Sequence, residues 1–131
     1  MNETKLETII RMTKVLNRFK EQHPRIIDIG VVSTDTFYET MGKELPLWSR
    51  HIKPNKGEYV GYIRIKCSDK LSKHLGCNSL WEYIVNDKAE DAIIGAAQVM
   101  HAVCTAKSYK DEAKFSGSIS KAISSLDFSN I

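Results

Sequence analysis

The segment 87–107 constrains the fold most, because it is predicted to form a long helix that is apolar around most of its circumference. Its polar residues fall on a narrow stripe, which consists of Asp91, Gly95, Gln98 and Thr105. A helix of this kind lies in the middle of a fold or is shared with a second subunit. The sequence therefore predicts a central helix, with a homo-oligomer formed through residues 87–107 as the alternative.

Three further segments supply the rest of the predicted framework. Residues 3–22 carry apolar side chains at helical spacing, and the helix is expected to end at His23-Pro24, because the residue before proline avoids the helical conformation. Segments with β-branched residues or alternating apolar and polar residues predict about three strands, at 26–33, 47–52 and 58–67. Helices follow the strands instead of alternating with them, so an α+β fold is expected, with a small mainly antiparallel sheet packed by the two long helices.

Shorter elements complete the prediction. Ser68 is expected to cap a helix over 69–75 that Gly76 ends, and a second short helix is predicted at 80–85. Residues 36–41 fit a helical segment, with an extended arm as the alternative. Residues 109–131 predict either a short docked helix or a loosely attached serine-rich segment, within a single domain of residues 1–131.

Composition limits the class of protein. With 131 residues, 42% hydrophobic and 27% charged, the chain is long and apolar enough for one folded core. Three cysteines form no paired framework, which is typical of a reducing compartment. No apolar run is long enough to span a bilayer, and a cytoplasmic location is expected.

Positive charge is concentrated in one stretch, from Arg50 to Lys73. It holds seven Lys/Arg against two acidic residues, an excess of five, whereas the whole chain carries a formal charge of +3. In the strand 58–67, alternation places Tyr62, Arg64 and Lys66 on the face opposite the core, which is expected to be half exposed. Cations bind phosphates, and aromatic rings stack on unpaired bases. The candidate ligand-binding residues are therefore Trp48, Arg50, Tyr62, Arg64, Lys66, Lys70 and Lys73.

Two groups of cysteine and histidine residues are weaker candidates. Cys67, His74 and Cys77, with His51 as a fourth, do not have a standard zinc spacing. His101 and Cys104 share one helix face, but a nucleophilic cysteine needs exposure and a lowered pKa. No metal, cofactor or catalytic residue is therefore assigned from these groups.

Asp28 lies in an otherwise apolar strand and is the best single candidate for a metal-binding carboxylate. No Walker loop, dinucleotide fingerprint, G-x-S-x-G or HExxH motif accompanies it. The leading hypothesis is a non-enzymatic binding or regulatory protein for an anionic partner, either nucleic acid, a nucleotide or an acidic protein surface. The alternatives are a protein-interaction or inhibitor module acting through the apolar helix, and a carboxylate-metal hydrolase centred on Asp28.

Overall fold

The structure is a computed structural model that describes residues 3–40 and 58–129. In chain order its elements are α1 (Lys5–Glu21), β1 (Ile26–Ser33), α2 (Thr34–Thr40), β2 (Tyr59–Lys66), α3 (Asp69–Leu75), β3 (Ser79–Asn86), α4 (Ala89–Ala106) and α5 (Lys110–Ser124).

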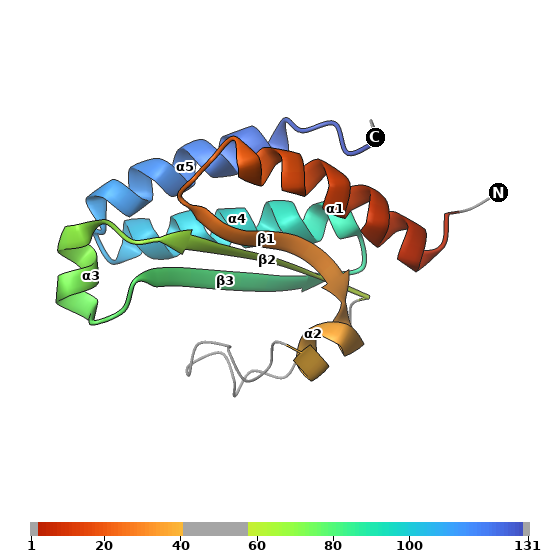
Figure 1. Cartoon of the computed structure of the whole chain (residues 1–131), viewed down its shortest axis with the longest axis horizontal. Coiled ribbons are helices and arrows are strands. Elements are labelled where there is room, and N and C mark those ends of the chain that lie inside the picture. Colours follow the sequence, from red (N-terminus) through yellow and green to blue (C-terminus); the bar gives the residue numbers. More distant parts are fainter. Residues whose placement is uncertain (1–2, 41–57, 130–131) are drawn as a thin grey trace.

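The three strands form an antiparallel sheet in the order β1-β2-β3, which confirms the predicted α+β fold with a small antiparallel sheet (Figure 1). The register places Tyr62 of β2 between Gly30 of β1 and Tyr83 of β3. The α3 helix lies in the connection between β2 and β3, at the end of the sheet where the chain also turns from α4 into α5.

One predicted element is wrong in type: residues 80–85 belong to the strand β3 and not to a helix. Tyr62 pairs with Tyr83, and Arg64 pairs with Trp81, along the whole edge of β2. Aromatic and β-branched side chains pack well across neighbouring strands, and this long-range pairing outweighs the local helical spacing. The predicted strand at 47–52 lies outside the described residues.

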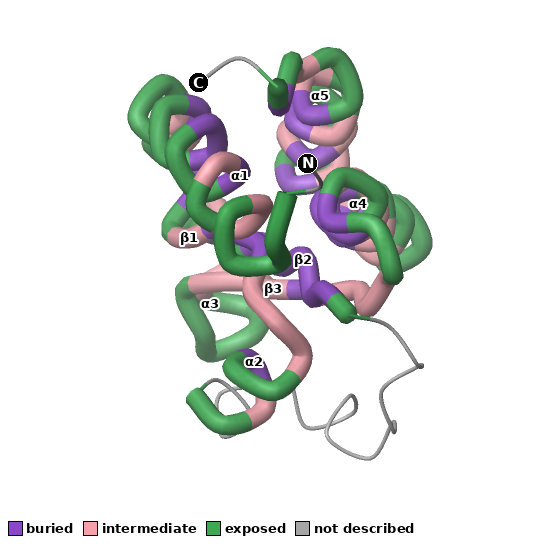
Figure 2. The backbone as a smooth tube through the Cα atoms, turned by 90° about the vertical axis from the view of Figure 1, so that its right-hand side faces the viewer, coloured by how far each residue is buried: buried purple, intermediate pink, exposed green. Residues whose placement is uncertain are grey.

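Helices cover the two faces of the sheet unequally. The α1, α4 and α5 helices lie on one face, and among the described elements only α2 lies on the other (Figures 1 and 2). The main core forms under α1, α4 and α5, and a smaller cluster of Phe37, Val60 and Tyr62 forms on the α2 face. The alternation predicted for β2 is present, since Tyr59, Ile63 and Ile65 enter the main core.

The sheet approaches the helical layer closely at Gly61. A Cβ atom at this position would meet the main-chain atoms of Ala92 and Ile93 on α4. The absence of a side chain therefore lets β2 lie directly against the α4 backbone.

The ends of α3 and α5 determine the shape of the site described next. Ser68 caps α3 by accepting a hydrogen bond from the Leu71 amide, and Gly76 ends the helix at φ 71°, as predicted. The α5 helix is held by Ile119 and Ile123, which are buried in the main core.

Candidate anion-binding site

The predicted binding residues lie in different surroundings. Trp48, Arg50 and His51 lie outside the described residues. Tyr62 is only 8% exposed, so the expectation of a half-exposed aromatic ring on this face is wrong. Phe37 lies 6.3 Å from its ring centroid, and a Cβ on Gly30 would come within 2.6 Å of the Tyr62 hydroxyl. Burial, followed by the nearby charge of Asp28, raises the pKa of Tyr62 to about 12.

The cationic members of the predicted set that the structure describes are exposed and belong to two elements, β2 and α3. The Nε of Arg64 donates a hydrogen bond of 2.8 Å to the Ser79 hydroxyl on β3, and Lys66 is exposed on the same face of β2. Lys70 and Lys73 are exposed on α3. Among the members of this set within residues 58–129, Lys70 is the one that lines the cavity described next.

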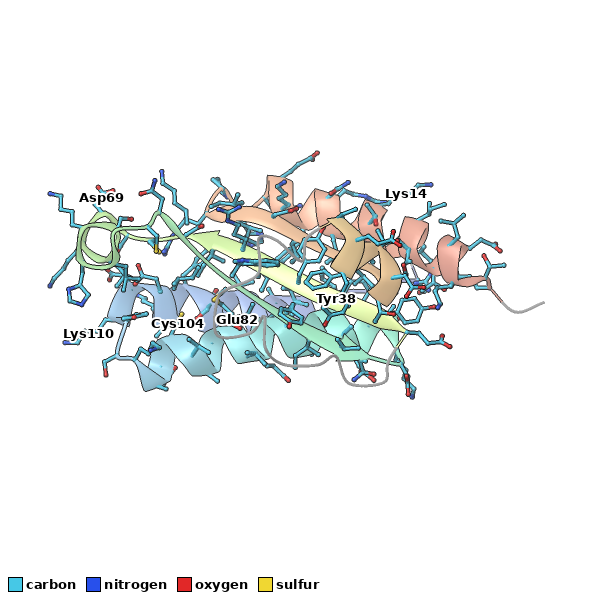
Figure 3. All side chains as sticks on the ribbon, turned by 90° about the horizontal axis from the view of Figure 1, so that it is seen from below. Lys14, Tyr38, Asp69, Glu82, Cys104 and Lys110 are labelled. Atoms are coloured by element: carbon cyan, nitrogen blue, oxygen red, sulfur yellow. The ribbon has the colours of Figure 1, made fainter. Side chains whose placement is uncertain are left out.

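A cavity of about 420 Å³ lies between α3 and the corner where α4 joins α5. Figure 3 shows Lys110 at the same end of the molecule as Asp69 of α3, far from Lys14 on α1. The residues that line the cavity are Ser68, Lys70, Leu71, His74, Lys107, Tyr109, Lys110, Asp111 and Glu112. Three lysines from separate segments thus surround one cavity.

A sharp turn brings two of these lysines together. Ser108 adopts a left-handed conformation with φ 58°, and the Tyr109 amide donates to the Cys104 carbonyl, so α4 ends and α5 begins within a few residues. Lys107 and Lys110 flank this turn. The spacing of the two lysines was visible in the sequence, but their proximity to α3 depends on the packing of α5 and was not.

Glu112 ties α5 to the start of α3. Its Oε1 accepts a hydrogen bond of 2.7 Å from the Ser68 amide and lies 3.8 Å from the Arg25 guanidinium, and the side chain is 2% exposed. Burial alone would raise the pKa of Glu112, but the hydrogen bonds from Ser68, together with Arg25, outweigh burial and lower the pKa. Glu112 is therefore an ionised structural group whose charge is already compensated.

A second cavity of about 550 Å³ adjoins the first. Its lining residues are Arg25, Ser68, Asp111, Lys114, Phe115 and Ser118, so Ser68 and Asp111 belong to both cavities. The Arg25 guanidinium lies 4.4 Å from the centroid of the Phe115 ring and donates a hydrogen bond of 2.9 Å to the Lys66 carbonyl. These contacts hold Arg25 in a fixed orientation at the wall of the second cavity.

The three cysteines differ in exposure. Cys67 and Cys104 are buried, whereas Cys77 is exposed. Burial raises the pKa of Cys67 to about 11 and also raises that of Cys104. A ring nitrogen of His101 lies 3.4 Å from the Ser116 hydroxyl on α5. Neither buried thiol has the exposure or the lowered pKa that a nucleophilic cysteine requires.

The carboxylate candidate Asp28 is half-buried, and its Oδ1 accepts a hydrogen bond of 3.0 Å from the Ile29 amide. Within residues 3–40 and 58–129, no three His, Cys, Asp or Glu side chains are grouped so as to hold a metal ion.

Comparisons of the chain with protein-family models, with curated proteins and with solved structures found no match. In the part of the chain that the structure describes, no helix combines the length and apolar character needed to cross a membrane. Function is therefore inferred from the chemistry of the two cavities.

Proposed function

We propose that this protein is a non-enzymatic binding protein whose ligand is a phosphate-bearing anion held between α3 and the α4–α5 corner. The observation that supports this proposal is the convergence of Lys70, Lys107 and Lys110 on a cavity of about 420 Å³. Cavities that bind small molecules have about 300–1,000 Å³. The site thus has the size and the charge for a phosphorylated ligand.

The start of α5 adds to the attraction for an anion. The first amides of a helix carry a partial positive charge and bind phosphate groups. Tyr109, at the N-cap of α5, makes no side-chain capping hydrogen bond. Lysine ammonium groups supply strong charge-assisted hydrogen bonds to phosphate. Asp111 and Glu112 already occupy the first turn of α5 and offset part of this attraction, so the three lysines supply most of the preference for an anionic over a neutral ligand.

The packing of α4 favours this proposal over an interaction module that acts through the same helix. Ala92, Ile93, Ala96 and Ala97 are buried within a single chain, against the sheet and the other helices. A surface that is already covered in this way offers little apolar area to a second subunit.

Removal of two cavity lysines provides the first test. Lys107→Ala combined with Lys110→Ala is expected to weaken the binding of inorganic pyrophosphate at least about tenfold, because charge-assisted hydrogen bonds contribute about 1.5–3 kcal/mol each. Isothermal titration calorimetry of the full chain measures the change. The matched control is Lys14→Ala with Lys88→Ala, which removes the same charge from exposed positions that line neither cavity.

An equal loss of affinity in both double variants would indicate a general charge effect and contradict the proposed site. If pyrophosphate does not bind to the unchanged protein, the proposed function is contradicted.

A substitution at Asp111 is expected to strengthen ligand binding, in contrast to the loss of the lysines. Its exposed carboxylate lines both cavities and repels an anion. Asp111→Asn is therefore expected to strengthen pyrophosphate binding about threefold at low salt. Titrations at 20 mM and 200 mM salt would measure this gain in affinity, which should be smaller at the higher concentration because salt screens the charge. Weaker binding in this variant would mean that Asp111 supports pyrophosphate binding and does not repel the anion, which would contradict the proposed electrostatics.

A further inference from the structure

We infer that the ligand is a short single-stranded nucleic acid that runs from the first cavity into the second, an inference that rests on the proposed function. The two cavities have about 420 and 550 Å³ and share Ser68 and Asp111 in their walls. The two adjoining cavities together form the proposed groove, which follows α5 from the α4–α5 corner past Ser68 at the start of α3. A groove of this extent is longer than one phosphate group needs.

The cations follow the groove in sequence. Lys107 and Lys110 line the first cavity, and Lys114 lines the second. Lys110 and Lys114 are one helical turn apart, so they lie on the same side of α5 with their Cα atoms separated by about 6 Å along the axis. Cations repeated along one helix face suit a ligand whose phosphates also repeat along its length.

Planar groups lie beside these cations in both cavities. Tyr109 lines the first cavity, and Phe115 lines the second. The Arg25 guanidinium stacks on Phe115, and the Arg25 side chain keeps 34% of its surface exposed. Unpaired bases stack on aromatic rings and on guanidinium planes. The combination of repeated cations with planar groups is typical of sites for single strands.

This chemistry separates a single strand from other anionic ligands. Bases in a duplex are stacked on one another and cannot reach Tyr109 or Arg25. An acidic peptide has the charge but no planar base, and a mononucleotide has a single base, whereas planar groups lie in both cavities. The structure thus favours an oligonucleotide over each of these.

Fluorescence anisotropy of 5′-labelled oligomers of eight thymidine or eight uridine nucleotides tests the inference with the full chain. Both oligomers are expected to bind at least tenfold more tightly than the unlabelled mononucleotides, measured by competition, and an octamer of deoxyuridine compared with the uridine octamer identifies the preferred sugar. With four phosphate contacts, affinity should fall about 50-fold between 50 mM and 200 mM salt, since each contact contributes about −0.7 to the slope of log K against log salt.

Lys114→Ala distinguishes the second cavity from the first. This variant is expected to weaken oligomer binding about five- to tenfold and to reduce the salt slope by about 0.7, while pyrophosphate binding in 200 mM salt, where distant charges are screened, changes much less. The matched control is Lys121→Ala, on the same helix but outside both cavities, which should change neither.

Each failure has a distinct meaning. If pyrophosphate binds but the oligomers bind no more tightly than mononucleotides, the single-strand inference is overturned and the proposed function stands. An octamer of glutamate that binds as tightly as the oligonucleotides overturns the inference in favour of an acidic peptide. If neither pyrophosphate nor any oligomer binds, the inference and the proposed function both fail.

Discussion

Gly61→Ala is expected to lower the free energy of unfolding by about 3 kcal/mol. The added methyl group would overlap the main-chain atoms of Ala92 and Ile93, and these atoms cannot rotate away as a side chain can. Relief requires α4 to move off β2, which would open contacts in the main core. Overpacking of a core ordinarily costs about 1–3 kcal/mol, and a main-chain overlap belongs at the upper end of this range.

Chemical denaturation of the variant measures this cost, and Gly95→Ala is the matched control. A Cβ at Gly95 would lie 3.3 Å from the Cγ2 methyl of Ile84, so a small shift of one side chain is enough and no main-chain atom has to move. Alanine is also the better helix former by about 1 kcal/mol, so this substitution in α4 is expected to leave stability nearly unchanged. Similar losses in the two variants would mean that the approach of β2 to α4 is not the reason for glycine at position 61.

Glu82→Gln is expected to stabilise the protein by about 2 kcal/mol at pH 8 and to have little effect at pH 4. Glu82 lies on β3 opposite Ile63 and is 6% exposed, and burial raises its pKa to about 7 from the ordinary 4.5 (Figure 3). The folded state therefore holds the proton more tightly than the unfolded state does. The stability associated with the protonated carboxyl is complete below about pH 4.5 and is lost as the pH rises through 7.

The raised pKa of Glu82 means that ionisation of its carboxyl lowers the free energy of unfolding by about 3 kcal/mol. The expected gain from glutamine is smaller than this, because a buried amide retains part of the cost of burying a polar group. Chemical denaturation at pH 4, 6 and 8 measures the free energy of unfolding of the variant and of the unchanged protein, and the difference between the two should grow as the pH rises. The control is Glu21→Gln, at an exposed position at the end of α1. Its free energy of unfolding should differ from that of the unchanged protein by the same amount at each pH. A difference for Glu82→Gln that stays the same at each pH would show that its carboxyl titrates normally in the folded protein.

The local signals in the sequence were sufficient for most of the fold. The capping serine at position 68 and the glycine at position 76 set the ends of α3, and the alternation in β2 identified Ile63 and Ile65 as core residues. The segment that became β3 was misassigned, because its strand character depends on pairing with β2. Pairing between distant segments leaves little trace in a window of eight residues.

The candidate site was predictable only in part. Lys70 belongs to the charged stretch that the sequence singled out, and it does line the cavity. Lys107 and Lys110 lie some forty residues further along the chain, and only the tertiary fold brings them to the cavity that Lys70 lines, with Lys114 in the adjoining second cavity. The burial of Tyr62 could not be predicted from the sequence either, because it depends on Gly30 of the neighbouring strand and on Phe37 of α2.

The unequal exposure of the three cysteines has a practical consequence. Cys67 and Cys104 are buried thiols with raised pKa values, whereas Cys77 is exposed directly after α3. Thiol reagents such as maleimide dyes react with accessible thiolates, so they would modify Cys77 selectively. The natural sequence thus carries a single attachment point for a fluorescent label, three residues after His74 in the wall of the proposed groove.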